Sequence, residues 1–305
     1  GKRMIVEKIK SEKDDLNLSV SIIEPNIEAK GIVQISHGMA EHKERYYDIM
    51  NYLAENGYVC IIHDHRGHGA SVKSEKDLGY FYSENIDFIV DDLYKITKYI
   101  KNKYPNLKLT LFSHSMGTLV ARNYLKKYDN EIDKIILCGP PTKNNLSTLG
   151  IIIAKILNFF YNKNTPNKIL NNMTFGNYNK KEKIENGWIS ENIENVKKNN
   201  EDELCGYIFT TNGFINLYKL MKKAFDKRDW KIKNKELKLY VIAGENDPVI
   251  QNKTKFEELV NFLEEIGYKN IKFKLYKNMK HEILNEKENK KVYDDIFNFI
   301  DKEEA

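Results

Sequence analysis

The sequence predicts an α/β fold in which a mostly parallel eight-stranded sheet is flanked by helices and carries an inserted helical cap. Three observations predict it: short β-type runs bounded by turn residues, helical patterns that alternate with those runs, and one long interruption of the alternation. Strands that alternate with helices form parallel sheets covered on both faces. A chain of 305 residues with 41% hydrophobic residues can bury one such core together with an insertion.

Eight runs have the composition of strands. The first two flank the turn-rich stretch SEKDDLN and are therefore expected to pair as an antiparallel hairpin. Runs such as IIHD and KIILCG are apolar on both faces, as central strands of a parallel sheet must be. The expected strands span residues 3–9, 17–23, 31–36, 58–63, 108–113, 134–138, 238–243 and 271–276. The expected core helices span residues 44–56, 84–103, 116–128, 253–266 and 289–301.

No strand is evident between Gly139 and Glu236, although helical patterns recur there. A gap of that length is not an ordinary loop, so it is expected to be a helical cap inserted into the sheet domain. The helical patterns within it span residues 146–161, 182–198 and 212–226. The predicted division assigns residues 1–141 and 231–305 to the two parts of the core and residues 142–230 to the cap.

The run LTLFSHSMGTLVARNYL changes abruptly from a strand pattern to a helix pattern. A serine at such a turn is held in a strained backbone pose, with its side chain exposed and the amides of the helix behind it. Small residues must flank the turn because strand and helix approach closely there. Ser113 and Gly117 meet this demand around Ser115, although the usual G-x-S-x-G pattern has glycine where Ser113 stands. Ser115 is therefore the predicted nucleophile, with mild crowding expected at Ser113.

A serine hydroxyl needs a base, and the base needs an acid that orients it. In sheet hydrolases of this kind the order along the chain is serine, acid, histidine. His281, in YKNMKHEILNE after the last expected strand, is the only histidine downstream of Ser115. The acid should follow the preceding strand, where LKLYVIAGENDPV offers Asp247 and Glu245. Asp247 is favoured because Pro248 ends the turn and a short side chain suits a tight loop, and Glu245 is the alternative.

The tetrahedral intermediate of acyl transfer needs two amide donors. One is expected to be the N–H of Met116, directly after the nucleophile. The other is expected from the loop IVQISHGMAEH, in which Gly38 lets the backbone turn and Met39 presents its N–H. This loop follows the carboxyl end of an expected parallel strand, where ligands bind in open α/β sheets.

Four segments carry more specific motifs: SHGMAEHKERYYDIMNYLAENGYVCIIHDHRGHGAS, FSHSMGTLVARNYL, AGENDPV and KHEILNE. They resemble the α/β-hydrolase fold and, within it, the monoacylglycerol lipase and lysophospholipase family, through the pieces HG-x-x-EH and D-x-RGHG-x-S. WISENIENVKKNNEDELCGYIFT is similar to that family's cap segment, and the resemblance spans residues 22–299 and is weakest at 142–180. The resemblance implies hydrolysis of carboxylic esters of single acyl chains without a cofactor. The site residues it implies are the triad Ser115, Asp247 and His281 and the oxyanion amides of Met39 and Met116.

The sequence is open to three other interpretations. The run HDHRGH, residues 63–68, resembles the metal motif of metallo-β-lactamase-like hydrolases but lacks one ligand. The remaining ligands would have to come from His114 and His281, and the fold order is wrong for that family. A structured loop, with Asp64 and Arg66 placed to pair and glycines at the turn, is favoured, so neither a metal nor a cofactor is predicted. A non-catalytic binding member usually lacks a triad residue, and here all three are present. Within the enzymes, a short-chain carboxylesterase or thioesterase is the alternative to a lipase.

Composition limits the partners and the location. The 49 basic and 44 acidic residues are interspersed, without the aromatic-basic pattern of nucleic-acid binding, and no obligate protein partner is evident. The expected partner is a small lipid ester. Cys60, Cys138 and Cys205 are odd in number and far apart, which predicts a reducing, cytoplasmic location without disulfides. The start of the sequence lacks the apolar core of a signal peptide.

The most apolar stretch, LGIIIAKILNFFY at residues 149–161, is interrupted by Lys155 and too short to span a bilayer. Two interpretations of it are open. It packs within the core of the cap, or part of it lines an acyl tunnel and touches a membrane surface transiently. The second interpretation would make the protein peripheral to the membrane, and nearby Lys163 and Lys168 would suit anionic headgroups.

Overall fold

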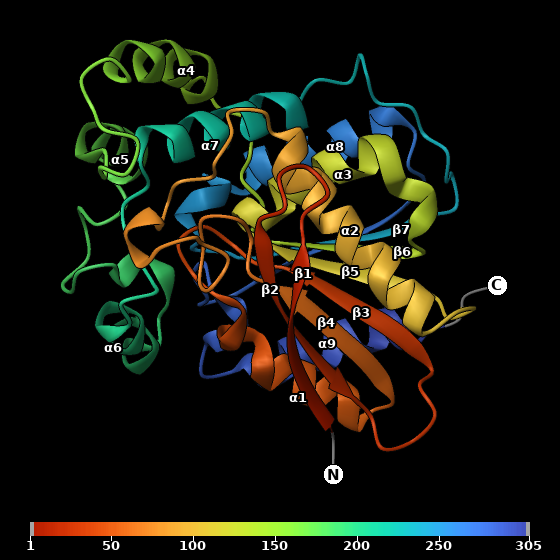
Figure 1. Cartoon of the computed structure of the whole chain (residues 1–305). Coiled ribbons are helices and arrows are strands. Elements are labelled where there is room, and N and C mark those ends of the chain that lie inside the picture. Colours follow the sequence, from red (N-terminus) through yellow and green to blue (C-terminus); the bar gives the residue numbers. More distant parts are fainter. Residues whose placement is uncertain (1–2, 303–305) are drawn as a thin grey trace.

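The computed structural model describes residues 3–302, and within them eight strands form a single sheet (Figure 1). The strand order across the sheet is β1-β2-β4-β3-β5-β6-β7-β8. Strand β2 pairs antiparallel with β1 and β4, and all other neighbours are parallel, which confirms the predicted hairpin and the mostly parallel sheet. The strands are β1 Arg3–Lys10, β2 Asn17–Glu24, β3 Gly31–Ser36, β4 Tyr58–His63, β5 Leu109–His114, β6 Lys134–Cys138, β7 Lys238–Gly244 and β8 Asn270–Tyr276.

Helices cover both faces of the sheet, so the core has three layers (Figure 1). Helices α1 and α9 pack on one face, and α2, α3 and α8 pack on the other. The apolar residues of α2 recur at helical spacing, so Ile89, Leu93, Ile96 and Ile100 all point into the core. The five predicted core helices are confirmed as α1 Tyr47–Glu55, α2 Asp87–Lys103, α3 Met116–Tyr128, α8 Lys253–Ile266 and α9 Asn289–Asp301.

The central strands explain where the site forms. Every residue of β3, β4, β5 and β6 is buried, which is why apolar residues occur on both faces of these strands. Because β3, β5, β7 and β8 run parallel, their carboxyl ends meet at one edge of the sheet. The loops that leave these four ends carry, in turn, Met39, Ser115, Asp247 and His281.

Four α-helices occupy the chain between β6 and β7. They are α4 Leu146–Leu157, α5 Lys168–Phe175, α6 Ile193–Glu201 and α7 Thr211–Ala224. Short 3-10 turns complete the described elements: η1 Lys43–Tyr46, η2 Glu75–Asp77, η3 Asp129–Glu131, η4 Gly187–Ile189, η5 Pro248–Ile250 and η6 Ile283–Asn285.

The predicted helix over residues 182–198 is wrong in its first half. Asn186 adopts a left-handed φ of 59°, which an α-helix does not contain, and α6 starts only at Ile193. The sequence patterns also do not predict α5. Its start is fixed by Asn167, whose side chain accepts a hydrogen bond from the N–H of Leu170 at 3.0 Å.

Helix α7 joins the inserted helices to the sheet domain. Phe214 and Tyr218 are fully buried and belong to the same apolar cluster as the buried residues of α2 and α3. On α3, the side chain of Asn123 donates a hydrogen bond to the carbonyl of Leu220 at 3.2 Å. The inserted helices therefore share a core with the sheet, and the boundaries of the predicted cap stay a prediction.

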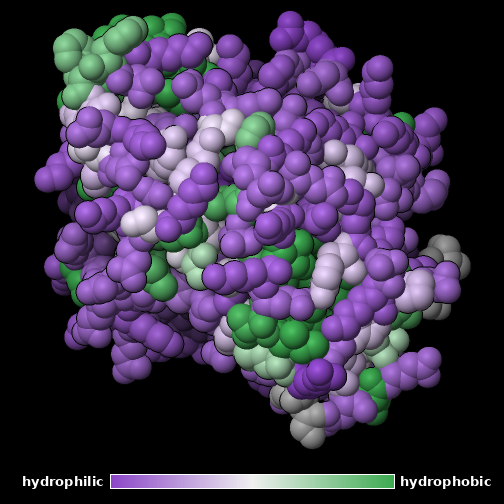
Figure 2. All heavy atoms as spheres, viewed as in Figure 1, coloured by the Kyte–Doolittle hydropathy of each residue, from purple (hydrophilic) through white to green (hydrophobic). Residues whose placement is uncertain are grey.

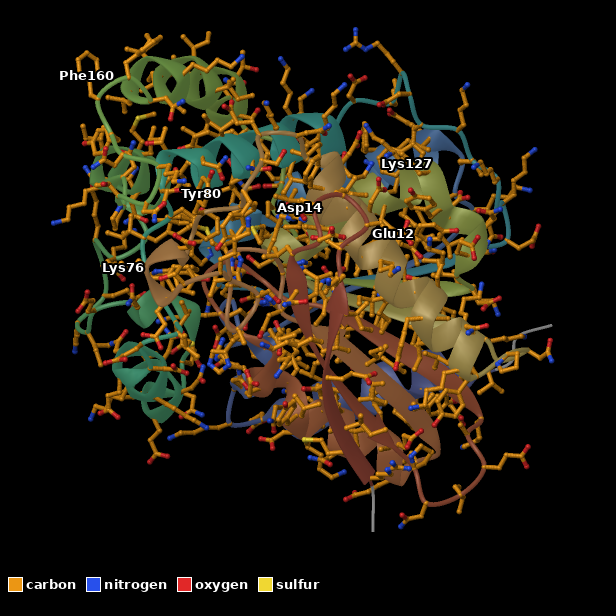
Figure 3. All side chains as sticks on the ribbon, in the orientation of Figure 1. Glu12, Asp14, Lys76, Tyr80, Lys127 and Phe160 are labelled. Carbon is orange, nitrogen blue, oxygen red and sulfur yellow. The ribbon has the colours of Figure 1, made fainter. Side chains whose placement is uncertain are left out.

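Helix α4 and the turn that follows it expose apolar side chains to solvent. Phe159 and Phe160 are 89% and 79% exposed, and Leu149, Ile152 and Ile156 are each more than half exposed. These residues account for the hydrophobic area over α4 in Figure 2, at the corner where Figure 3 labels Phe160. No helix within residues 3–302 combines the length and the apolar character that crossing a bilayer requires.

Candidate active site

Ser115 lies at the turn between β5 and α3, and its backbone is strained. Its φ of 54° and ψ of −121° are rare for a residue with a side chain. The turn is fixed because the N–H of Ser115 donates to the carbonyl of Cys138 at 2.9 Å. Glycine is required at position 117, since a Cβ there would lie 2.2 Å from the carbonyl oxygen of Ser36. Strand, turn and helix thus approach as the sequence pattern predicts.

The serine that replaces the usual glycine at position 113 is accommodated by a hydrogen bond. Ser113 is fully buried, and its hydroxyl donates to the carbonyl of Ile136 on the neighbouring strand at 2.8 Å. The extra polar group is therefore satisfied, and the turn at Ser115 forms with this residue in place.

His281 and Asp247 are brought together from the loops after β8 and β7. Nδ1 of His281 lies 2.8 Å from Oδ2 of Asp247, whose other oxygen accepts the N–H of Val249 at 2.8 Å. Asp247 is only 2% exposed, so water competes little for this contact. Glu245, the alternative acid, is exposed and makes no hydrogen bond to His281 within the described chain. Of the two candidate acids, the structure brings only Asp247 to the imidazole.

One cavity of about 460 Å³ collects the predicted site residues at the carboxyl edge of the sheet. Ser115, His281, Met39 and Met116 all line it. Residues 3–302 contain no hydrogen bond between the Ser115 hydroxyl and His281. Contacts between nucleophile and base are often long in the absence of substrate and shorten when it binds.

The two predicted oxyanion amides border this cavity. The N–H of Met39 has no backbone acceptor among residues 3–302, so it can donate into the cavity. Met116 is the first residue of α3, and an N–H at that position has no acceptor within its own helix. Both residues line the same cavity as Ser115, and their role as oxyanion donors stays a prediction.

Glu41 holds the loop that contains Met39, and the sequence analysis did not single it out. Its Oε2 accepts hydrogen bonds from the N–H of Gly38 at 2.6 Å and from the hydroxyl of Tyr46 at 2.7 Å. Burial alone would raise the pKa of Glu41, but His114, whose Nδ1 lies 3.5 Å from Oε2, and the charge of Arg45 hold it well below its usual value. The HG-x-x-EH motif contains this glutamate, so the signal for it was present in the sequence.

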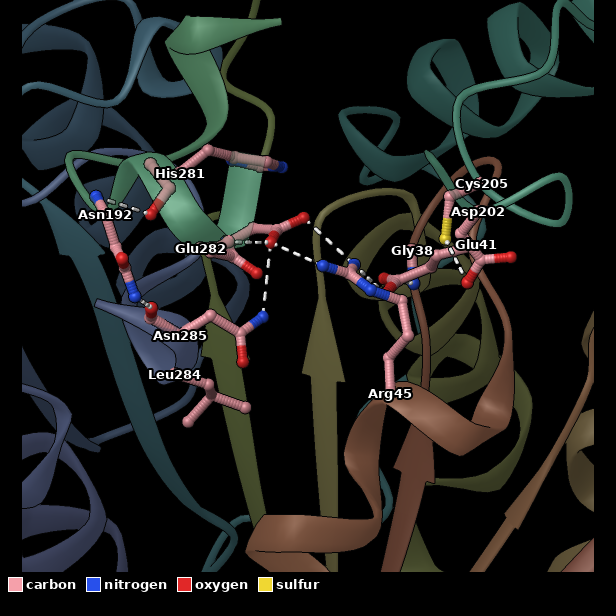
Figure 4. A network of polar contacts seen from close by, with 12 residues as sticks. Gly38, Glu41, Arg45, Asn192, Asp202, Cys205, His281, Glu282, Leu284 and Asn285 are labelled. Carbon is pink, nitrogen blue, oxygen red and sulfur yellow. Dashed lines mark hydrogen bonds and ion pairs between the residues drawn. The ribbon is translucent and has the colours of Figure 1, made fainter. Parts of the chain in front are cut away.

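Arg45 bridges two carboxylates in the wall of the cavity (Figure 4). Its Nη1 donates to Glu41 at 2.9 Å and to Glu282 at 3.0 Å, and its Nη2 donates to Glu282 at 2.7 Å. Arg45 is the only lysine or arginine among the described residues that line the cavity. This end of the cavity is therefore polar, with two carboxylates around one guanidinium whose terminal nitrogens are engaged.

The cavity also has an apolar wall, made largely by the inserted helices. Four aliphatic side chains contribute to it: Leu119 on α3, Leu146 on α4, and Leu217 and Met221 on α7. Trp188, which follows α5, lies with its ring centroid 5.3 Å from that of His281. The sequence analysis did not assign Trp188 a place at the site, because no pattern within the cap relates it to the histidine.

The HDHRGH run forms a buried loop, but not through the pair predicted for it. Nε of Arg66 donates to Asp92 at 2.8 Å and Nη1 donates to Asp14 at 2.9 Å, so the prediction of an Asp64–Arg66 pair is wrong. Asp64 instead accepts two backbone N–H groups, that of Lys43 at 2.7 Å and one within its own loop at 3.0 Å. The carboxylate of Asp64 is needed to satisfy these amides. Arg66 therefore pairs with Asp92 and Asp14, which lie farther away in the sequence.

Four histidines of this region pack as a buried group: His37, His63, His65 and His68. Burial lowers the pKa of all four rings, to about 3 for His63 and for His68. The rings are therefore uncharged at neutral pH. Among residues 3–302, no three side chains of the HDHRGH run bring ligand atoms close enough together to share one metal ion.

Comparisons with known proteins identify the family and the fold. The sequence matches the family Hydrolase_4, described as serine aminopeptidase, S33, over residues 27–288. A monoacylglycerol lipase of Mycolicibacterium smegmatis is 23% identical over 281 residues, covering 90% of this chain and 90% of that protein. A probable lysophospholipase L2 of Haemophilus influenzae is 25% identical over 281 residues, covering 88% and 82%. The structure of a thermostable carboxyl esterase from Bacillus coagulans superposes with a TM-score of 0.88 at 24% identity over 97% of both chains, which confirms the predicted fold.

Proposed function

Because the chain belongs to the serine aminopeptidase S33 family of α/β hydrolases, we propose that it is a serine esterase acting on single-acyl-chain lipids. In this proposal Ser115 is the nucleophile, His281 is the general base, and Asp247 orients His281. The N–H groups of Met39 and Met116 form the oxyanion hole. One observation carries the proposal: a serine with a strained backbone and a carboxylate-bound imidazole line the same cavity.

The proposed reaction consists of two acyl transfers. Ser115 Oγ attacks the ester carbonyl while Nε2 of His281 takes the hydroxyl proton, and the two amides hold the oxyanion. His281 then gives the proton to the leaving alcohol, and the acyl group stays on the serine. Water attacks this acyl-enzyme with His281 again as base, and the carboxylic acid leaves as Ser115 regains its proton. Asp247 keeps the imidazole in one tautomer and stabilises its charged form.

Two features support a lipid ester as the substrate. The relatives named above include a monoacylglycerol lipase and a probable lysophospholipase, each similar over more than four fifths of this chain. The cavity volume lies within the range of about 300–1,000 Å³ that is common for small-molecule sites. Its aliphatic wall suits an acyl chain, and its polar wall beside His281 suits the alcohol.

The polar wall favours an uncharged alcohol over a phosphate-bearing one. A phosphate would meet the carboxylates of Glu41 and Glu282, and the guanidinium of Arg45 is already engaged by both. Hydroxyl groups can donate to such carboxylates, whereas a phosphate can only be repelled by them. We therefore place monoacylglycerols ahead of lysophospholipids as substrates, with short-chain carboxylic esters and thioesters as the alternative class.

The nucleophile is tested by covalent labelling and by substitution. A fluorophosphonate should label Ser115 alone, and Ser115→Ala should lower turnover of a p-nitrophenyl ester on the order of 10⁶-fold. Ser113→Ala is a matched control, because it removes a nearby hydroxyl that bonds a backbone carbonyl, and it should retain labelling. Near-normal turnover by Ser115→Ala would refute the proposal.

The substrate class is tested by comparing alcohols at a fixed acyl chain. Monoacylglycerol should be hydrolysed faster than lysophosphatidylcholine with the same acyl group. Glu282→Gln, which removes one of the carboxylate charges, should bring the two hydrolysis rates closer together. Rates on monoacylglycerols should also rise with acyl length, since each buried methylene contributes about 0.8 kcal/mol. Equal rates from acetyl to long-chain esters would favour the short-chain alternative, and preferential cleavage of an aminoacyl anilide would favour a peptidase.

We also propose that the exposed residues on and after α4 touch membranes transiently, as a cytoplasmic enzyme peripheral to the bilayer would. Phe159 and Phe160 are the most exposed of these apolar side chains, and Lys155 and Lys163 flank them. Apolar side chains with neighbouring lysines are typical of surfaces that rest on anionic lipids. Such contact would bring the cavity, whose wall includes Leu146 of the same helix, close to lipid substrates.

This contact is tested by sedimentation with anionic vesicles. Burial of one phenylalanine contributes about 1.5–3 kcal/mol, so replacing both Phe159 and Phe160 by serine should weaken vesicle binding by at least about 100-fold. The double variant should keep its activity on a soluble ester. Ile27→Ser is the matched control, because Ile27 is 63% exposed but lies in the loop between β2 and β3. Unchanged vesicle binding by the double variant would refute the contact.

A further inference from the structure

A second group of chemically active side chains lies where the inserted helices meet the loop after β3. His42 comes from that loop, and Asp202 and Cys205 come from the segment between α6 and α7. One ligand atom from each, an imidazole nitrogen, a carboxylate oxygen and a sulfur, all lie within 4.8 Å of one another. This is the one such group of three or more found within residues 3–302. The proposed esterase mechanism uses none of these side chains.

The carboxylate of Asp202 is the centre of the group. Its Oδ2 lies 2.6 Å from Nε2 of His42 and 3.4 Å from Sγ of Cys205. Its other oxygen accepts the N–H of Leu204 at 2.9 Å, which fixes the orientation of the carboxylate. Figure 4 shows Cys205 and Asp202 in contact near Glu41 and Arg45. Three different donor atoms therefore converge without any rearrangement of the backbone.

These separations suit a tetrahedral ion. Zinc bonds of about 2.0–2.3 Å place neighbouring ligand atoms roughly 3.3–3.6 Å apart. The 3.4 Å between Asp202 and Cys205 already meets this requirement. The 2.6 Å between His42 and Asp202 must open by somewhat less than about 1 Å, which a small rotation of the imidazole can supply.

The far side of His42 has the partner that metal-binding histidines usually have. Nδ1 of His42 lies 2.9 Å from Oε1 of Glu44. Since Nε2 faces Asp202, both ring nitrogens lie against carboxylates, and Nε2 gives up its proton when it binds a metal. The carboxylate on Nδ1 then keeps the remaining proton on that nitrogen and makes the imidazole a stronger ligand. The side chain of His42 is 9% exposed, so its orientation is set by these two contacts.

The two segments that supply the ligands are also tied through the backbone. The N–H of Gly206 donates to the carbonyl of Ala40 at 2.9 Å. Ala40 lies between Met39 and Glu41 in the loop that the proposed mechanism uses for the oxyanion. An ion held by this group would therefore join the inserted helices to the oxyanion loop.

We propose that His42, Asp202 and Cys205 bind a divalent ion of the zinc type, with water as the fourth ligand. Imidazole, thiolate and carboxylate together are the ligands that zinc takes in proteins. Binding releases two protons, one from Nε2 of His42 and one from the Cys205 thiol, and both go to solvent. The thiolate and the carboxylate together balance the charge of the ion. This site is separate from the HDHRGH run, and its existence does not depend on the proposed esterase activity.

Cobalt is the direct probe, because thiolate-bound tetrahedral Co²⁺ has a ligand-to-metal charge-transfer band. The full-length protein, freed of metal with a chelator, should take up one Co²⁺ per chain with this band, and zinc should displace it. Cys205→Ser should abolish the band, while Cys60→Ser, which removes a buried thiol from β4, should retain it. Absence of the band in the unchanged protein, or its persistence in Cys205→Ser, would overturn the proposal.

Glu44→Gln tests the geometry without touching a ligand. Glu44 is exposed, so the variant is expected to fold normally. Loss of the carboxylate on Nδ1 should weaken zinc affinity, measured by calorimetry, by roughly 10–100-fold. Zinc should also raise the melting temperature of the unchanged protein but not that of Cys205→Ser. Equal zinc affinity in the unchanged protein and Glu44→Gln would overturn binding through Nε2 of His42.

Discussion

The sheet domain and the inserted helices α4–α7 meet across one cavity, but they hold their residues in different ways. At the sheet edge the polar groups are buried and fixed by several contacts each, as with Asp247 and Glu41. The inserted helices supply an aliphatic wall and leave other apolar residues, such as Phe159 and Phe160, in solvent. Chemistry requires fixed geometry, whereas selection of an acyl chain requires only shape and apolar surface. If the proposed function is right, the residues at the sheet edge set the rate on every ester, and those of the inserted helices set which ester is preferred.

The largest expected effect tests this separation directly. Asp247→Asn should lower kcat by about 10⁴-fold on long and short esters alike, because the amide favours the wrong tautomer of His281. Leu146→Ala, on the opposite wall, should leave short esters unchanged and weaken only the dependence on acyl length. Stopped-flow hydrolysis of a p-nitrophenyl ester series measures both. An effect of Asp247→Asn confined to long esters would contradict the expectation that sheet-edge residues affect all esters alike.

The next effect tests whether the two regions fold together. Phe214→Ala on α7 should destabilise the protein by about 3–5 kcal/mol, since Phe214 is fully buried in the cluster shared with the sheet. Phe112→Ala on β5 is the matched core variant and should have a similar cost. Urea unfolding followed by circular dichroism should show one transition for both variants. A separate early transition for Phe214→Ala would show that the inserted helices unfold on their own.

The sheet domain should also be the acid-sensitive region, because its histidines are buried and uncharged. His63 has a folded pKa of about 3, so below about pH 6.5 the unfolded chain binds a proton that the folded chain excludes. The free energy of unfolding should therefore fall as pH decreases, by up to about 1.4 kcal/mol per pH unit for each such histidine.

His63→Leu sharpens this prediction. Neither ring nitrogen of His63 has a hydrogen-bond partner among residues 3–302, so an apolar replacement leaves no group unsatisfied. Between pH 6 and pH 4.5 the free energy of unfolding of the variant should fall less steeply with decreasing pH, by the contribution of about one proton. Urea midpoints measured across this range give the slope. An unchanged pH dependence would show that His63 does not contribute.

The smallest effect compares helix starts in the two regions. Asn167→Ala at the start of α5 and Asn252→Ala at the start of α8 should each cost about 1 kcal/mol, because both side chains accept an N–H of the first turn. Asn167→Ala should destabilise the protein more, because the side-chain amide of Asn167 also donates to Thr211 at 2.8 Å and the residue is fully buried. Thermal denaturation ranks the two variants. A larger loss for Asn252→Ala would contradict the assignment.

The sheet could be predicted from the sequence because its signals are local and strong. Every expected strand agrees with the structure to within one residue at each end, as with Tyr58–His63. Strands buried on both faces are rich in apolar residues at successive positions, which makes them easy to recognise. The chain order serine, acid, histidine leaves few candidates for the triad. The structure brings Asp247 to His281 as expected, and the assignment of Ser115 as their partner in catalysis stays a prediction.

The inserted helices could be predicted only in part, for physical reasons. Residues 182–192 are rich in charged side chains and carry few apolar ones. Their backbone conformation therefore depends on tertiary contacts, such as that of Trp188 with His281, which a sequence pattern does not reveal. Helix α5 has a clear start signal at Asn167, but a single turn residue is weak without a long apolar stripe. Buried charges such as Glu41 look like ordinary surface residues in a sequence until their partners are known.

The order of the strands has a consequence for how the protein is made. Strand β5, which ends before Ser115, is synthesised long before β7 and β8, which complete the sheet at its far edge. At ribosomal rates of roughly 5–20 residues per second, the proposed nucleophile precedes its base on the order of ten to thirty seconds. A nascent or prematurely terminated chain would therefore be unable to hydrolyse lipid. In the proposed mechanism the site is complete only after β8 and the following loop, which carries His281, have been synthesised.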